Sequence, residues 1–130
     1  MKRKLDRFYE QSKIYSQYRP TYPARLYQYI YSFCEAKNAC WDCGTGNGQV
    51  AVVLSKSFAQ VFASDISKQQ IQQAVRLDNI EYTVQRAEQT SFINDSFDLI
   101  TVAQAVHWFD LHAFNHEVKR VLKPNGIIAI

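Results

Sequence analysis

The sequence lacks the long apolar runs, the strong charge excess and the repeats that mark several classes of protein. Nowhere in its 130 residues does an apolar stretch approach the roughly 18 residues that a membrane-spanning helix needs. The basic start, residues 1–4, is followed by no apolar segment, so we expect no secretory signal. A net charge of +3 is too small to indicate nucleic acid as a partner. We therefore expect a single domain, 1–130, that binds neither membranes nor nucleic acid.

Cysteine is scarce, and its odd count of three indicates reduced thiols in a cytoplasmic protein. Cys40 and Cys43 have the spacing of a redox pair, but they precede a glycine-rich turn and fall within a predicted strand. Side chains three apart on a strand point to opposite faces. A zinc site needs two further ligands, and there is no second cysteine pair. We expect two small core residues and no metal.

Glycine is also scarce, yet three of the four glycines lie within residues 44–48. The apolar run 39–43 precedes them and an apolar stretch from Gln49 follows, which predicts a strand, a turn and a helix. Glycine permits positive φ and lets a ligand approach the main chain. The N–H groups that open a helix favour an anionic group. This turn is therefore a candidate binding site.

Strand and helix patterns alternate along most of the chain. We expect a helical N-terminal segment over about 1–37 and an α/β core over about 38–130. This order predicts a doubly wound, Rossmann-like parallel sheet with helices on both faces. The strands are expected at 39–43, 61–65, 81–85, 97–103 and 127–130.

Three of the predicted helices carry apolar stripes that we expect to be buried on the sheet. Ser67 and Gln70 form a capping box at the start of the second of these helices. The segment 123–126, Lys-Pro-Asn-Gly, is expected to stop the last helix before the last strand. The stripes comprise Leu26, Ile30 and Phe33; Ile71, Ala74 and Val75; and Leu111, Phe114, Val118, Val121 and Leu122.

The chain ends within the apolar run 127–130, which leaves one edge of the sheet uncovered. Soluble proteins avoid bare apolar edges. We infer a domain truncated after its fifth strand; a partner that covers this edge is the alternative.

A carboxylate, Asp65, ends the second predicted strand, about twenty residues beyond the first. There it can accept hydrogen bonds from both hydroxyls of a ribose. Dinucleotide-binding proteins share this arrangement, but three details favour another ligand. Gln49 replaces the last glycine of the dinucleotide fingerprint, Asp42 would repel a pyrophosphate and attract an amine, and a helix precedes the first strand. A ligand with an amine, a carboxylate and an adenosine fits all three.

The sequence resembles the class I S-adenosylmethionine-dependent methyltransferases over most of its length. The segments that carry the resemblance are D-C-G-T-G-N-G, A-S-D-I-S, R-A-E-Q-T-S-F, S-F-D-L-I-T-V-A-Q-A-V-H-W-F-D and E-V-K-R-V-L-K-P-N-G. Y-R-P-T-Y-P and H-W-F-D resemble the small-molecule subgroup that includes trans-aconitate methyltransferase and the type 11 methyltransferases. The family fold has seven strands, so the resemblance implies that strands which help to build the acceptor pocket are missing here.

The resemblance implies that S-adenosylmethionine is the cofactor and that the first two strands carry much of its site. Asp42 and the main chain at Gly44 and Gly46 would hold the methionine portion. Asp65 would bind the ribose hydroxyls, and Ile66 would pack on the adenine.

Two later segments complete this implied cofactor site. Ala87, through its main-chain N–H, and Glu88, through its side chain, would meet the adenine. Gln104 would border the sulfonium. Arg86 stands where many relatives carry an acidic residue, which leaves the contact to the adenine amino group open.

Three residues are candidates for the acceptor site. His107, as a general base, and Trp108, as an acceptor contact, follow the fourth strand; packing under the rim of the sheet is the alternative. Arg19 would hold a carboxylate or, alternatively, anchor the N-terminal segment. His112 and His116 have a metal-ligand spacing, but they fall opposite the apolar face, which indicates a solvated pair.

We therefore expect an enzyme that transfers a methyl group from S-adenosylmethionine to a small-molecule acceptor. One alternative is a non-catalytic module that binds S-adenosylmethionine or S-adenosylhomocysteine. Another is an NAD-dependent oxidoreductase. The sequence identifies neither the acceptor nor the oligomeric state.

Overall fold

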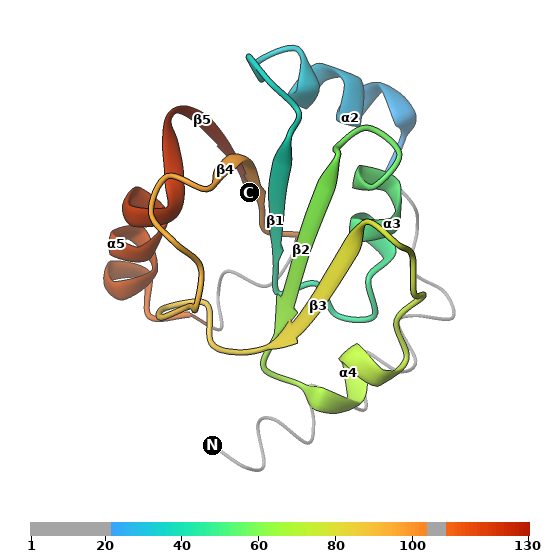
Figure 1. Ribbon diagram of the computed structural model, residues 1–130, viewed down its shortest axis with the longest axis vertical. Coiled ribbons are helices and arrows are strands. Elements are labelled where there is room, and N and C mark those ends of the chain that lie inside the picture. Colours follow the sequence, from blue (N-terminus) through green and yellow to red (C-terminus); the bar gives the residue numbers. More distant parts are fainter. Residues whose placement is uncertain (1–21, 104–108) are drawn as a thin grey trace.

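The computed structural model describes residues 22–103 and 109–130, and within them the strands form one sheet. The strands are β1 (Ala39–Cys43), β2 (Gln60–Asp65), β3 (Ile80–Val84), β4 (Phe97–Thr101) and β5 (Leu122–Ala129). All neighbouring pairs are parallel, and the strand order is β3-β2-β1-β4-β5 (Figure 1). The chain thus runs from β1 outward to β3, then returns to the other side of β1. This reversal between β1 and β4 is where open α/β sheets bind ligands.

Helices lie on both faces of this sheet, as the sequence predicted (Figure 1). The described helices are α2 (Ala24–Tyr31), α3 (Gln49–Leu54), α4 (Lys68–Gln72) and α5 (Leu111–Val121). α2 and α3 pack on one face and α5 packs on the other. No helix in the described part of the chain is long and apolar enough to cross a membrane.

Each face of the sheet has its own apolar core. Cys43 belongs to the core under α5, whereas Cys40 belongs to the core under α2 and α3. Their side chains therefore point to opposite faces, as alternation along β1 requires. Burial raises the pKa of both thiols and keeps them protonated. The prediction that they are core residues is confirmed.

The core under α5 is centred on Trp41, whose side chain is fully buried. Three phenylalanine rings surround it, with centroids at 5.3 Å for Phe92, 5.9 Å for Phe97 and 6.2 Å for Phe114. The indole N–H donates a hydrogen bond of 2.9 Å to the Ser64 hydroxyl in β2. Apolar contacts and one satisfied polar group thus fix the middle of β1 against its neighbours.

The predicted apolar stripes of α2 and α4 are only partly buried. α2 ends at Tyr31, so Phe33 lies beyond the helix and is 53% exposed, and Leu26 is 39% exposed. Ile30 and Tyr31 make the contacts to the core instead. α4 ends at Gln72, which leaves Val75 57% exposed. Apolar spacing indicated the helices correctly, but it did not show where they end.

The stripe of α5 is largely as expected. Phe114, Val118 and Val121 are buried, but Leu111, the first residue of the helix, is 54% exposed. An acidic residue, Glu117, is buried on the same side.

The segment 123–126 is not a turn before β5 but part of it, so that prediction is wrong. Phe97 pairs with Leu122 and Leu99 pairs with Ile127, which forces the intervening residues of β5 to bulge from the ladder. A Cβ on Gly126 would come within 2.9 Å of the Phe97 carbonyl oxygen, so only glycine allows this close approach. Helix and strand therefore follow each other without a connecting loop.

Candidate functional site

The turn between β1 and α3 has left-handed main chain at each of its glycines. The φ angles are 67° at Gly44, 61° at Gly46 and 85° at Gly48. A Cβ on Gly48 would collide with the Tyr82 hydroxyl oxygen, whereas one on Gly46 would meet nothing within 4 Å. The main chain is thus packed at one end of the turn and open at Gly46.

Asp42 lies beneath this turn and is 1% exposed. Its Oδ2 accepts a hydrogen bond of 2.6 Å from the Thr45 hydroxyl, and its Oδ1 accepts one of 2.7 Å from the Thr101 hydroxyl. The carboxylate therefore joins the glycine turn to the end of β4. The two threonines were missed from the sequence, although Thr45 lies three residues from Asp42, within reach of a local side-chain bond.

Asp65 lies at the end of β2 and is 5% exposed. Its Oδ2 accepts from the Gly46 N–H and its Oδ1 accepts from the Ser67 N–H, each at 2.9 Å. Burial raises the pKa of this carboxyl, while the main-chain N–H donors oppose the shift. The side chain thus holds the turns after β1 and β2 against each other at the carboxyl edge of the sheet.

The capping box predicted at α4 is half formed. The Ser67 hydroxyl accepts from the Gln70 N–H at 3.2 Å, as expected. The Ser67 N–H, however, donates to Asp65 rather than to the Gln70 side chain. Asp65 thereby takes the place of the reciprocal bond and fixes the start of α4.

The remaining implied cofactor residues differ in exposure. Ile66 follows Asp65 and is 45% exposed, whereas Ala87 is 4% exposed and belongs to the core under α5. The Glu88 side chain accepts from the Arg86 guanidinium at 3.5 Å and from the Asp110 N–H at 3.4 Å. Glu88 therefore bridges the segment after β3 to the start of α5.

An ion pair that sequence reasoning missed, between the buried Glu117 and the partly exposed Arg120, joins α5 to the segment before β4. Glu117 accepts from the Thr90 N–H at 2.7 Å and from the Thr90 hydroxyl at 2.6 Å. Arg120 donates to both Glu117 oxygens, at 2.9 Å and 2.7 Å, and to Asn94 at 3.0 Å. These bonds lower the pKa of Glu117 to about 2. The three-residue spacing of the pair on a helix was the available signal.

Several predicted residues lie outside the described part of the chain. Arg19, Gln104, His107 and Trp108 fall within residues 1–21 and 104–108. Their assignment to the cofactor and acceptor sites stays a prediction.

The two histidines of α5, His112 and His116, are both exposed. Within residues 22–103 and 109–130, no group of three or more metal-ligating side chains comes together. The spacing of these histidines therefore has no third ligand near it in that region.

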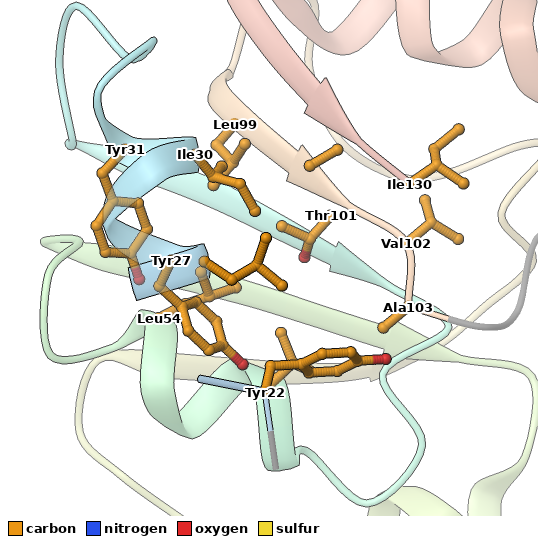
Figure 2. A pocket seen from close by; sticks show the side chains of 13 residues that line it. Tyr22, Tyr27, Ile30, Tyr31, Leu54, Leu99, Thr101, Val102, Ala103 and Ile130 are labelled. Atoms are coloured by element: carbon orange, nitrogen blue, oxygen red, sulfur yellow. The ribbon is translucent and has the colours of Figure 1, made fainter. Parts of the chain in front are cut away.

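A cavity of about 270 Å³ opens between α2, α3 and the ends of β4 and β5 (Figure 2). Thr101 lines it and also binds Asp42, so the cavity adjoins the glycine turn. Its lining is Tyr22, Leu26, Tyr27, Ile30, Tyr31, Val50, Leu54, Leu99, Thr101, Val102, Ala103, Ala129 and Ile130.

The sequence matches the family model described as methyltransferase domain over residues 41–130. A protein of Dictyostelium discoideum that is named as a candidate methyltransferase is 44% identical over 96% of this chain and 48% of its own length. A protein of Saccharomyces cerevisiae that is named as a candidate S-adenosylmethionine-dependent methyltransferase is 29% identical over 92% of this chain and 44% of its own length.

The fold is also similar to that of a solved methyltransferase structure. The structure described as a candidate type II methyltransferase from Anaeromyxobacter dehalogenans has a TM-score of 0.81 and 38% identity. The matched region covers 85% of this chain and 48% of the chain in that structure. The chain thus spans about half the length of the relatives it matches.

Proposed function

The chain belongs to the methyltransferase-domain family, and on that premise we propose that it binds S-adenosylmethionine at the glycine turn and supports methyl transfer to a small-molecule acceptor. The observation that carries the proposal is Asp65, a buried carboxylate held by main-chain N–H groups beside an open glycine. The relative from Saccharomyces cerevisiae supports it, because its name includes S-adenosylmethionine.

The residues present fit this cofactor at three points. Gly46 leaves its main chain open to a ligand atom, since nothing lies within 4 Å of a Cβ built there. A carboxylate has about four acceptor positions, so Asp65 keeps capacity for ribose hydroxyls beside its bonds to Gly46 and Ser67. The exposed side chain of Ile66 offers an apolar surface to a ring.

Asp42 has a different part in the proposed site. Both of its oxygens accept hydroxyl bonds within the protein, so the side chain acts from beneath the turn. A negative charge there favours an ammonium or sulfonium group above it. The family resemblance implies that Asp42 contacts the methionine portion directly. We propose instead that Asp42 holds the turn from beneath and supplies a negative charge.

The bound cofactor supplies a methyl group on positive sulfur: the carbon–sulfur bond breaks as the acceptor's electron pair bonds the carbon, and any proton displaced from the acceptor leaves to a base or to water. The chain's own residues would bind the cofactor and the acceptor, orient them toward each other and exclude water from between them. Such alignment of two reactants is worth up to roughly 7–11 kcal/mol. His107 stays the candidate base, and acceptors that carry no proton need none.

Asp65→Ala tests the proposed cofactor site. We expect the affinity for S-adenosylmethionine, measured by calorimetry, to fall by at least about tenfold, since charge-assisted bonds contribute roughly 1.5–3 kcal/mol each. Asp78→Ala removes an exposed carboxylate from the turn before β3 and serves as the control. Unchanged affinity in Asp65→Ala, with the fold intact by circular dichroism, would show that the cofactor binds elsewhere.

Two further measurements separate the alternatives. A thermal-shift comparison of NAD with S-adenosylmethionine distinguishes an oxidoreductase from a methyltransferase. Product formation, measured beside binding, distinguishes an enzyme from a non-catalytic module, which is relevant because the chain spans about half the length of its relatives.

A further inference from the structure

Thr101 is the last residue of β4 (Figure 2), and it lies directly beside Asp42 in the parallel register of β1 and β4. Cys40 and Leu99, two residues earlier on each strand, belong to the core under α2 and α3, so Asp42 and Thr101 point to the same face. Asp42 is 1% exposed and Thr101 is 7% exposed. The Thr101 hydroxyl donates a hydrogen bond of 2.7 Å to Asp42 Oδ1. This contact therefore depends on the pairing of the two strands rather than on the glycine turn.

A second donor to Asp42 comes from the turn itself. The Thr45 hydroxyl donates to Asp42 Oδ2 at 2.6 Å. The Thr45 N–H donates to the Ser64 carbonyl at 2.9 Å, and the Thr45 carbonyl accepts from the Gly48 N–H at 3.0 Å, so the main chain of Thr45 is fixed without its hydroxyl. A donor on each oxygen defines the plane of the carboxylate. Thr101 contributes to this orientation from outside the turn.

Asp65 holds the other side of the turn by separate bonds. Its oxygens accept from the N–H groups of Gly46 and Ser67, and neither bond involves Thr101. The turn is therefore attached to the sheet at two places, through Asp42 to β4 and through Asp65 in β2. In the proposed site Asp65 faces the ribose, whereas Asp42 supplies charge to the ammonium end. A change at Thr101 should therefore act on one end of the ligand.

We propose that Thr101 is a positioning residue for the amino-acid portion of the cofactor and that it acts through Asp42. This role rests on the proposed function, since it takes S-adenosylmethionine as the ligand of the turn. Without the Thr101 hydroxyl, a buried carboxylate oxygen loses a donor, which is costly, and the carboxylate turns toward another donor. The turn then loses the orientation that the amino-acid portion needs. The end of β4 thereby helps the site to select an adenosine that carries an amino acid.

The test compares two ligands that share an adenosine and a neutral sulfur. S-adenosylhomocysteine carries the amino-acid portion, and 5′-methylthioadenosine lacks it. Calorimetry on this chain gives both dissociation constants, and their ratio isolates the amino-acid portion. We expect Thr101→Val to weaken S-adenosylhomocysteine at least about fivefold, because a bond to a charged group is lost. The affinity for 5′-methylthioadenosine should stay within about twofold, because the adenosine lies away from the changed contact.

Two variants separate positioning from a loss of structure. Thr101→Ser keeps the hydroxyl and should restore the S-adenosylhomocysteine affinity to within about threefold of the unaltered chain. Thr83→Val is the matched control: it removes a hydroxyl in β3 that accepts from Gln85, and it should leave both dissociation constants unchanged. If Thr101→Val does not fold, Thr101→Cys takes its place, since a thiol is a weak donor. It should change the ratio in the same direction, and an unchanged ratio would contradict the role.

A double-mutant cycle shows whether Thr101 acts through Asp42. Asp42→Asn removes the charge and should itself weaken S-adenosylhomocysteine more than 5′-methylthioadenosine. In that background Thr101→Val should weaken S-adenosylhomocysteine by no more than about twofold further, because the effects of two residues in one contact are not additive. An effect of Thr101→Val that is equal in both backgrounds would mean that the residue does not act through Asp42.

The outcomes separate the role of Thr101 from the proposed function. Equal weakening of both ligands by Thr101→Val, without recovery in Thr101→Ser, would show a purely structural residue and overturn the proposal. So would an unchanged ratio in a folded Thr101→Val variant of a chain whose S-adenosylmethionine affinity responds to Asp65→Ala; the proposed function would then stand. A chain that binds neither S-adenosylmethionine nor S-adenosylhomocysteine would reject the proposed function and the role of Thr101 with it.

Discussion

Asp42 and Asp65 are two buried carboxylates at one edge of the sheet with different kinds of partner. Two threonine hydroxyls donate to Asp42, whereas main-chain N–H groups donate to Asp65. A hydroxyl rotates with its side chain, but a main-chain donor is fixed by the fold. The direction of the Asp65 donors is therefore fixed by the main chain, which suits the residue proposed to position a ribose.

The glycines of the turn offer a matched pair of substitutions. Gly46→Ala introduces a Cβ into open space at a φ of 61°, so it should cost about 1–2 kcal/mol of unfolding free energy for left-handed main chain alone. Gly48→Ala adds a collision with the Tyr82 hydroxyl, at a φ of 85°, and should cost more.

Cofactor affinity should follow the opposite order. Gly46→Ala fills the space that a ligand would use and should lower S-adenosylmethionine affinity more than its small effect on stability suggests. Urea unfolding and calorimetry on both variants measure the two quantities. A stability loss at Gly46 as large as that at Gly48 would contradict the open turn.

Single residues were only partly predictable. Asp65 and the glycines follow from their place at strand ends, which the apolar pattern reveals. Thr101 was not predictable as a partner of Asp42, because their separation of 59 residues is closed only by the pairing of β1 with β4.

At the scale of elements, the ion pair of Glu117 and Arg120 attaches α5 to the segment before β4. The Arg120 carbonyl also accepts from the Asp95 N–H at 3.0 Å, next to the Arg120 bond to Asn94. The segment from Thr90 to Asp95 is thus held by side-chain and main-chain bonds together.

Acid titration should reveal this attachment. The pKa of Glu117 is lowered to about 2 from 4.5, so its bonds contribute stability fully above pH 4.5 and lose it as the pH falls toward 2. Glu117→Gln should flatten that part of the curve of unfolding free energy against pH. Asp98, whose pKa is also lowered, should account for part of the remaining slope.

Glu81→Gln, at an exposed position in β3, is the control for this measurement and should keep the slope of the unaltered protein. Urea unfolding at several pH values gives both curves. An unaltered slope in Glu117→Gln would mean that the carboxylate is not held as described.

Elements were more predictable by type than by boundary. β1 has the predicted limits, because the glycines of the turn end it sharply. β5 begins earlier than predicted, since the residues 123–126 have the composition of a turn and only their pairing with β4 makes them part of a strand. Phe33 and Val75 continue an apolar spacing past the ends of α2 and α4, and spacing alone does not record a helix end.

At the scale of the whole molecule, the sheet has two edges in the described part of the chain, β3 and β5. Ile128 in β5 is 37% exposed, and Ile130, which follows the strand, is 73% exposed. An exposed apolar edge strand is a template for pairing with another strand.

The enclosure of Trp41 provides an intrinsic optical reporter. Away from water and bonded to Ser64, the indole should fluoresce at short wavelength, and any loosening of β1 should shift its emission to the red. The sequence has two tryptophans, so Trp108→Phe would leave this one as the sole source of the signal. Because Asp42 is the next residue, a conformational change at the glycine turn should alter the emission of Trp41, which can be measured without an added dye.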